Sequence, residues 1–359
     1  MGITIIHTAD LHLGKKHDTL PKDTAKHVAE KQFDTLRRII ELADKNNAAA
    51  ILISGDLFDS PAVQEGVSSR AAAILGGTDI PVFISPGNHD FYSPPSPYNR
   101  ISWPGNVYIF NTREIEKYDL GDFVVYGAAF RSQTVTDSLL KGFRNDDPRP
   151  SFMALHSELN ASSPRFSPIT TGEIAESGLT YLALGHTHQR SEIKTAGSAA
   201  YAFSGCPQGS GFDETGEKGV YLITYDDKLS AEFIPIPAPQ FRLLEVELSA
   251  SEDPAETILD RLPPDSREHL YKISLTGELA MSHEVYDKIN GLLSGHVLFS
   301  KLTDNTRLPK VIWESAEEDS LKGLFISMLK QRAESGAYPE ELIERAARFG
   351  IAALDGEEI

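Results

Sequence analysis

The sequence has little cysteine and no long apolar run. Cys206 is the single cysteine among 359 residues, which excludes a framework of internal disulfides and fits a reducing compartment. No apolar stretch approaches the roughly 18 to 20 residues that a membrane-spanning helix needs. We therefore expect a soluble, cytoplasmic protein that has no association with a membrane.

Positive charge is also scarce. The chain has 34 Lys and Arg against 52 Asp and Glu, which gives a formal net charge of −18 at pH 7. Proteins that bind nucleic acid alone normally have a basic surface, because neutralising phosphates supplies most of the affinity. The charge disfavours independent DNA binding without excluding it, since two bound divalent cations would add about four positive charges that the formal count omits.

Apolar runs of β type alternate with amphipathic helical stretches over roughly the first 230 residues. Strands are expected at 3–8, 50–54, 81–85, 107–110, 123–128, 151–155, 180–184, 200–204 and 219–225. Apolar residues recur near helical spacing over about 24–46, which predicts a helix, and 64–76 shows a weaker pattern of the same kind. Such alternation is typical of α/β layers around a sheet.

A domain boundary is expected at residues 235–239, where three prolines in five residues cannot continue a strand or a helix. The pattern beyond it predicts a small α+β module with strands at 241–248, 270–276 and 296–303 and helices at 254–262 and 282–293. A helical tail is predicted from 316 to 359. The chain is longer than one core usually supports, and the predicted domains are 1–238, 240–315 and 316–359.

Five apolar strands end in side chains that bind metals. The candidate ligands at these strand ends are Asp10, His12, Asp56, Asn88, His156, His186 and His188. Ligands of an α/β sheet bind outside the carboxyl ends of its strands, so these side chains are expected to project toward one edge. A glycine precedes three of them, at Gly55, Gly87 and Gly185, and is expected to let the backbone turn sharply there.

The ligand types decide the chemistry of this predicted site. Neutral imidazoles, carboxylates and one amide oxygen suit Mn, Fe or Zn, and the lack of cysteine ligands argues against structural zinc. Seven ligands are too many for one ion but fit two ions bridged by a carboxylate. Two such ions about 3.5–4 Å apart can hold a bridging hydroxide and stabilise both oxygens of an in-line displacement. The pattern therefore predicts hydrolysis of a phosphate ester.

These motifs resemble those of the calcineurin-like metallophosphoesterases, in the same order. The matching segments are Asp10-Leu-His12, Gly55-Asp56, Gly87-Asn88-His89-Asp90 and Gly185-His186-Thr-His188. Four further segments resemble the SbcD-type DNA repair exonucleases: Asp10-Leu-His-Leu-Gly14, Gly55-Asp-Leu-Phe-Asp59, Gly205-Cys-Pro-Gln208 and Gly216-Glu-Lys-Gly219. The resemblance covers about residues 1–240 and implies a β-sandwich flanked by helices, with a small α+β capping domain and C-terminal helices after it.

The resemblance also implies roles for the site residues. One metal would be held by Asp10, His12 and His188, and the other by Asn88, His156 and His186, with Asp56 bridging the two. His89 would donate a proton to the leaving oxygen, and Asp90 would orient His89. The two ions would most often be Mn, with Fe, Zn or a mixed pair as alternatives. No substrate-binding residue is predicted.

By the same resemblance, the chain would be a Mn-dependent DNA exonuclease that works 3′ to 5′, with single-strand endonuclease capacity. It would act as a homodimer with an SMC-like coiled-coil ATPase, which the C-terminal helices would grip. That partner could supply the DNA-binding surface that an acidic chain lacks. Two alternatives remain: a metallophosphoesterase for nucleotides, phosphoproteins or other small phosphoesters, and a scaffold with a vestigial site.

Other residues of ligand type have simpler interpretations. His7 lies within a predicted strand and is expected to be a packed core residue. Asp59 is expected to make hydrogen bonds within its loop. His17 and His27 are expected in a solvated loop, with contact to substrate phosphates as the alternative. His269 has no partner at ligand spacing and is interpreted as a surface residue.

Overall fold

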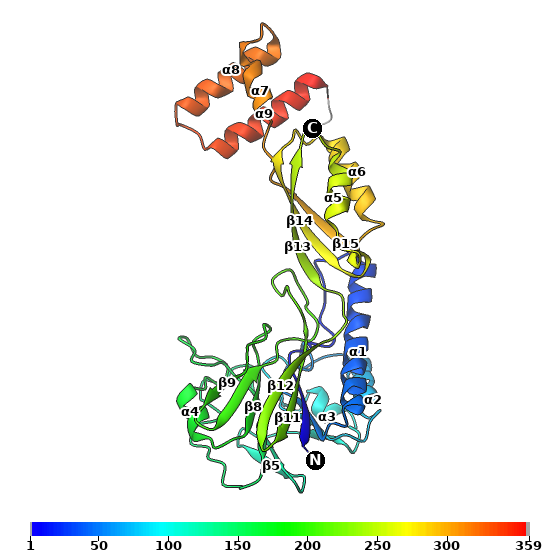
Figure 1. Cartoon of the computed structure of the whole chain (residues 1–359), viewed down its shortest axis with the longest axis vertical. Helices are drawn as coiled ribbons and strands as arrows, with labels where there is room; N and C mark the ends of the chain where they lie inside the picture. Colours follow the sequence, from blue (N-terminus) through cyan, green and yellow to red (C-terminus); the bar gives the residue numbers. More distant parts are fainter. Residues whose placement is uncertain (1, 357–359) are drawn as a thin grey trace. The chain divides into compact units, whose positions relative to one another are not determined.

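The computed structural model describes residues 2–356, so residues 357–359 of the predicted helical tail lie outside the described residues. The chain divides into two compact units, Met1–Gln240 and Phe241–Ile359. Both are drawn in Figure 1. Within residues 2–356, no helix combines the length and the hydrophobicity that crossing a membrane requires.

The first unit contains two sheets. The first sheet has, in spatial order, β12 (Lys228–Pro235), β11 (Gly219–Asp226), β1 (Ile3–Thr8), β2 (Ala50–Ile53), β3 (Val82–Ile84) and β4 (Val107–Ile109). The second sheet has β5 (Glu116–Asp119), β6 (Val124–Gly127), β7 (Ser151–His156), β8 (Tyr181–Gly185), β10 (Ala199–Phe203) and β9 (Lys194–Ala196).

A core lies between these two sheets, because alternate side chains of each strand point to the same face. Both sheets contribute to this core, with Ile5, Leu52, Phe83, Phe152 and Ala183 among its buried residues. Helices α1 (Lys22–Lys45) and α2 (Glu65–Leu75) pack on the outer face of the first sheet, and α4 (Thr171–Glu176) packs on the second. The predicted α/β fold, a β-sandwich flanked by helices, is confirmed.

The strand directions explain why the candidate ligands gather. Strands β1, β2 and β3 run parallel, and so do β7 and β8, where His156 pairs with Gly185. Contacts between the sheets join β1 to β8 and β2 to β7. The carboxyl ends of both sets of strands therefore open at the same edge of the sandwich, which is where side chains of an α/β sheet meet a ligand.

Three strands were not predicted, and all lie at sheet edges: β5, β9 and β12. Strand β12 ends at Pro235, so the proline-rich break begins after this residue rather than at it. Proline lacks the N–H that a central strand must donate, but an edge strand has a free side on which none is needed.

The second unit begins with a sheet whose strands all run parallel, with a helix in each crossover connection. Its elements are β13 (Phe241–Ser249), α5 (Pro254–Arg261), β14 (Leu270–Glu278), α6 (His283–Leu293) and β15 (Phe299–Asp304). His269, interpreted from the sequence as a surface residue, is instead buried, and its Nε2 lies 3.0 Å from Oδ2 of Asp265. The partner is another residue of the same module, which the sequence did not indicate.

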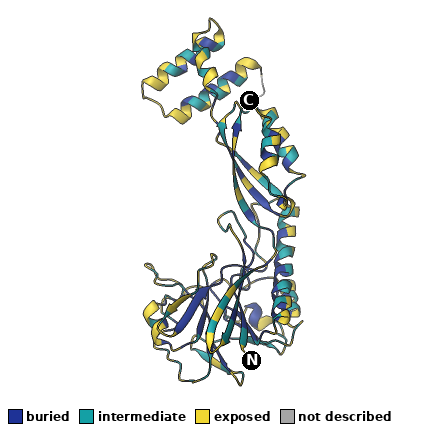
Figure 2. Ribbon diagram, in the orientation of Figure 1, coloured by how far each residue is buried: buried dark blue, intermediate teal, exposed yellow. Residues whose placement is uncertain are grey.

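The C-terminal helices follow as a separate cluster within the second unit. They are α7 (Lys310–Glu314), α8 (Leu321–Glu334) and α9 (Glu340–Asp355). Ile326 and Leu329 of α8 are buried in one core with Ile343 and Ala347 of α9. Figure 2 shows that buried residues concentrate on the strands of the first unit, whereas these helices carry many exposed residues.

Candidate metal centre

Four of the seven candidate ligands have a backbone conformation that side-chain-bearing residues seldom adopt. The φ angles are 55° at Asp10, 47° at His12, 49° at Asp56 and 105° at His186. Each such residue costs on the order of 1 kcal/mol or more and persists only where the surrounding structure fixes it. Strain of this kind is typical of functional sites, and in the described residues the other positive φ angles of non-glycine residues lie in connections between elements.

Backbone hydrogen bonds hold the first two ligand loops together. The N–H of Asp10 donates to the carbonyl of Gly55 at 3.0 Å, and the N–H of His12 donates to that of Asp56 at 2.9 Å. The carboxylate of Asp10 in turn accepts the N–H of His186, at 3.1 Å from each oxygen. Three strand ends are thereby fixed to one another before any ion binds.

Glycine is required at all three positions where the backbone was predicted to turn, and at Gly185 the reason is close approach rather than the predicted turn, since a Cβ would lie 1.8 Å from the carbonyl oxygen of Ser54. Gly55 has a φ of 95°, and a Cβ atom there would lie 2.2 Å from Nδ1 of His156, so the turn predicted at this position is present. At Gly87 the φ is not positive, but a Cβ would lie 2.3 Å from Oδ1 of Asp56. The need at Gly87 is therefore close approach of a neighbouring carboxylate, not the sharp turn that the sequence predicted.

One group of side chains forms around His12 and His188. Their Nε2 atoms lie 3.0 Å apart, and an oxygen of Asp10 completes a set whose ligand atoms all lie within 4.8 Å of one another. Imidazole nitrogens and a carboxylate at this separation are able to share one ion.

A second group forms around Asn88. Its Oδ1 lies 2.8 Å from Nε2 of His156 and 3.2 Å from Nδ1 of His186. Asp56 lies between the two groups, with Oδ2 at 3.5 Å from Nε2 of His156 and at 3.9 Å from Nε2 of His12. The structure thus brings all seven candidate ligands together and arranges them as two groups with one carboxylate between them.

Hydrogen bonds at Nδ1 determine which nitrogen of two histidine rings faces the site. Nδ1 of His156 lies 3.0 Å from the carbonyl oxygen of Ser54, and Nδ1 of His188 lies 2.7 Å from Oε1 of Glu214. Both oxygens only accept, so each Nδ1 carries the proton. Nε2 of the neutral ring then keeps its lone pair for a metal.

The electrostatics of the site favour bound cations. Burial, together with the neighbouring charge of Asp56, holds the pKa of Asp10 well above its ordinary value. Burial also lowers the pKa of His156, and burial together with His156 lowers that of His186 to about 4. His188 differs, since burial alone would lower its pKa but its hydrogen bond to a carboxylate raises it. Neutral His156 and His186 beside the buried carboxylates of Asp10 and Asp56 form a donor set that fits divalent ions.

His89 and Asp90 lie beside this group but do not interact as expected. His89 is 44% exposed, its N–H donates to Oδ1 of Asp56 at 2.9 Å, and its Nδ1 lies 3.1 Å from the carbonyl oxygen of Asp59. The buried carboxylate of Asp90 instead accepts the N–H groups of Phe58 and Gly87. The contact that orients the His89 ring therefore comes from Asp59, not from Asp90.

Comparison with known proteins agrees with this geometry. Residues 3–190 match the family model of the calcineurin-like phosphoesterases. The chain belongs to this family. The match includes all seven candidate ligands and His89.

Three relatives of this phosphoesterase are informative. It is 30% identical over 242 residues to the uncharacterized metallophosphoesterase YhaO of Bacillus subtilis, covering 62% of this chain and 57% of the relative. It is 27% identical over 245 residues to the DNA double-strand break repair protein Mre11 of Saccharolobus solfataricus, covering 63% of this chain and 61% of the relative. It is 25% identical over 262 residues to one of the subunits of the nuclease SbcCD of Bacillus subtilis, covering 61% of this chain and 65% of the relative. The matched region spans less than two thirds of the length of each relative.

The predictions for the remaining histidines of the phosphoesterase unit are confirmed only in part. His7 is a packed core residue as predicted, with Nδ1 2.9 Å from the hydroxyl of Tyr181. His27 is exposed, but it lies on α1 rather than in a loop. The prediction that His17 is solvated is wrong, because its side chain is buried. Burial and the nearby charge of Lys15 lower its pKa.

Two residues around the site were missed by the sequence. Glu214 contacts His188, and although burial alone would raise the pKa of Glu214, the hydrogen bond with His188 outweighs it and the pKa falls to about 2. Tyr98, on α3 (Pro97–Arg100), contacts Asp90. Glu214 lies between two of the segments that resemble the SbcD-type exonucleases, and this position is a weak sequence signal for a role at the site. The sequence around Tyr98 gives no signal for its contact with Asp90.

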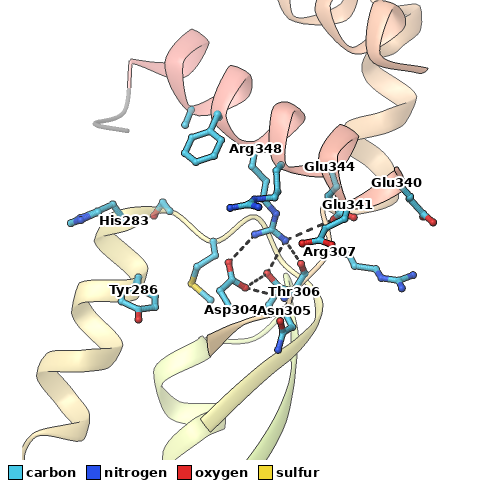
Figure 3. Close-up of a pocket in the computed structure, with 15 residues that line it drawn as sticks. His283, Tyr286, Asp304, Asn305, Thr306, Arg307, Glu340, Glu341, Glu344 and Arg348 are labelled. Atoms are coloured by element: carbon cyan, nitrogen blue, oxygen red, sulfur yellow. Dashed lines mark hydrogen bonds and ion pairs between the residues drawn. The ribbon is translucent and has the colours of Figure 1, made fainter. Parts of the chain in front are cut away.

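One pocket in the second unit has a different character from the metal centre. It has a volume of about 760 Å³ and is lined by residues of α6, of α9 and of the segment after β15. Figure 3 shows Arg348 reaching from α9 to Asp304 and Thr306, where its Nη1 donates to Oδ2 of Asp304 at 2.9 Å. This arginine joins the helical cluster to the sheet of the second unit, and the pocket contains none of the candidate ligands.

Proposed function

We propose that this phosphoesterase is a nuclease that hydrolyses DNA phosphodiesters with two bound divalent ions, most readily Mn, with Fe, Zn or a mixed pair as alternatives. The observation that carries the proposal is the division of the seven donors into two groups with Asp56 between them. The choice of DNA is supported by the relatives described as a DNA double-strand break repair protein and as part of a nuclease.

In the proposed site, Asp10, His12 and His188 would hold one ion, and Asn88, His156 and His186 would hold the other, with Asp56 shared. Two ions held there would supply Lewis-acid activation of the phosphate and of a water molecule. The backbone bonds between the ligand loops position the donors in advance, which limits the reorganisation needed when substrate binds.

His89 is proposed as the acid that protonates the leaving oxygen. Its Nδ1 is held 3.1 Å from the carbonyl of Asp59, so Nε2 is the nitrogen that can exchange a proton with substrate. Its exposure at the edge of the site leaves room for the leaving group. A general acid of this kind contributes roughly 10² to 10⁴ in rate.

A partner is proposed for the C-terminal helices. Leu321, Leu324 and Met328 recur along α8 at helical spacing and are exposed, which is the pattern of a helix face that binds another helix. We propose an SMC-like coiled-coil ATPase, with the nuclease acting as a homodimer in the cytoplasm, where its single buried cysteine stays reduced. The ATPase would supply the basic surface that a chain of net charge −18 lacks.

One alternative keeps the site and changes the substrate to small phosphoesters such as nucleotides, and the net charge of −18 favours it. The test uses the purified full chain with Mn, with and without an SMC-like ATPase, on a duplex DNA, a single-stranded DNA and a chromogenic phosphodiester. The proposal predicts Mn-dependent DNA cleavage that falls at least 100-fold in His89→Asn and is unchanged in His283→Asn, an exposed histidine of the second unit. Rapid turnover of the small diester without DNA cleavage under any divalent metal would contradict it.

A further inference from the structure

We propose that Glu214 is a positioning residue of the metal centre. It fixes the ring of His188 so that Nε2 faces Asp10 and His12, and it thereby strengthens the binding of the ion held by that group. This inference rests on the proposed function, because it takes His188 to be a metal ligand.

The first observation is that the Glu214 carboxylate is held at both oxygens. Oε1 lies 2.7 Å from Nδ1 of His188, while Oε2 accepts the N–H of Ser210 at 2.8 Å and lies 3.7 Å from Sγ of Cys206. The Glu214 side chain is only 11% exposed. A carboxylate with this many partners has one orientation, so it is able to hold the ring that it contacts in one orientation too.

The second observation is that the same loop holds the backbone of His188. The loop joins β10 to β11, and within it the N–H of Cys206 donates to the carbonyl of His188 at 3.1 Å. Nζ of Lys218 donates to the same carbonyl at 3.3 Å. The ring and the main chain of His188 are thus fixed from one segment, which leaves Nε2 pointing at its neighbour His12.

The chemical consequence concerns both the tautomer and the basicity of the ring. Because the carboxylate of Glu214 accepts, the proton of neutral His188 resides on Nδ1 and Nε2 is available as a donor. A hydrogen bond to an anion is stronger than one to a neutral group. It also makes the imidazole a better metal ligand, and loss of such a partner typically lowers metal affinity or activity by about 10- to 100-fold.

His156 provides an internal comparison. Its Nδ1 lies 3.0 Å from the backbone carbonyl of Ser54, so its tautomer is fixed by a neutral group that no side-chain substitution removes. The effect of replacing Glu214 should therefore be confined to the ion of the group that contains His188. An affinity loss limited to one of two ions is a signature that general unfolding would not produce.

The experiment measures binding of Mn to the chelator-treated full chain by isothermal titration calorimetry. The variants are Glu214→Ala, which removes the contact, and Glu214→Gln, which keeps an acceptor oxygen but loses the charge. The control is Glu217→Gln, the same charge change at an exposed position of the same loop. We expect one of the two ions to bind about 10- to 100-fold more weakly in Glu214→Ala, with a smaller loss in Glu214→Gln and none in Glu217→Gln.

A spectroscopic measurement gives a readout independent of activity. In the metal-free chain with ¹⁵N-labelled histidine, at a pH high enough to keep the ring neutral, His188 of the wild type should be the Nδ1–H tautomer, and Glu214→Ala should show a tautomer mixture. If Glu214→Ala does not fold, Glu214→Gln decides the question through its metal affinity. Two ions bound with wild-type affinity by a folded Glu214 variant would overturn this inference alone. A wild-type chain that binds no divalent ion would instead overturn the proposed function.

Discussion

The hydroxyl of Tyr98 donates a hydrogen bond of 2.5 Å to Oδ2 of Asp90, and both side chains are buried. Asp90 also accepts the N–H of Gly87 at 2.8 Å and that of Phe58 at 3.1 Å. One carboxylate therefore connects α3 with two ligand loops. Burial, with the nearby charge of Asp56, raises the pKa of Asp90 to about 7.

Tyr98→Phe tests this contact. Phenylalanine keeps the ring packed against Phe58 and Trp103 but removes one of the two hydrogen bonds that Oδ2 of Asp90 accepts, leaving the one from the N–H of Phe58. The variant should lose about 1–3 kcal/mol of stability, the usual range for the loss of one hydrogen bond to a charged group. Urea unfolding followed by fluorescence measures it. An unchanged midpoint would mean that the hydroxyl contributes nothing to the stability of these loops.

Asp56→Asn tests the shared position of its carboxylate. Because Oδ2 lies close to a histidine of each group, the loss of one charge should weaken both ions, on the order of 100-fold or more. His186→Ala removes a donor from one group and should weaken one ion. Calorimetric titration with Mn distinguishes the two patterns. A loss of only one ion in Asp56→Asn would contradict the bridging position.

Acid should destabilise the first unit through His7. Burial lowers the pKa of His7 to about 3, against 6.5 for the ordinary group, although a hydrogen bond to Leu184 partly opposes the change. Between these values the unfolded chain binds a proton that the folded chain excludes. Protonation of His7 therefore leaves the free energy of unfolding unchanged above pH 6.5 and lowers it progressively as the pH falls toward 3.

The measurement compares wild type with His7→Asn in a Trp313→Phe background, where Trp103 reports on the first unit because the chain has two tryptophans. The chain is kept free of metal throughout. The stability difference between wild type and variant should shrink by about 2–3 kcal/mol between pH 7 and 4.5. A difference that does not change with pH would show that His7 is protonated in the folded state.

The exposed row on α8 leads to a prediction about the partner. Leu324→Glu should abolish binding of the ATPase and the DNA cleavage that depends on it, because a charge in an apolar interface remains without a partner. Turnover of a small phosphodiester should be unchanged. Gln331→Glu adds the same charge at another exposed position of α8 and should behave as wild type. Partner binding that survives Leu324→Glu would exclude this face.

Much of the site was predictable because its ligands follow strand ends. His156 and His186 lie 30 residues apart in the sequence, but parallel pairing of β7 with β8 places their strand ends side by side. The edge strand β5 was not predictable, since three of the four residues of Glu116–Asp119 are charged and the strand has no apolar face.

The supporting residues were less predictable, because their contacts depend on how loops fold back. Asp90 follows His89 directly, which suggests contact, but the backbone bends at both residues, so adjacency in the sequence does not bring the two side chains together. The side chain of Asp90 instead faces Tyr98 and the interior. Glu214 reaches His188 across 26 residues of sequence, and no spacing rule connects a loop carboxylate to a strand-end histidine at that distance.

The central claim is that two ions occupy this site, and anomalous X-ray scattering from crystals grown with Mn tests it most directly. The account predicts two peaks, one among Asp10, His12 and His188 and the other among Asn88, His156 and His186, with the Asp56 carboxylate in contact with both. A single peak, or Mn bound only outside these side chains, would contradict it.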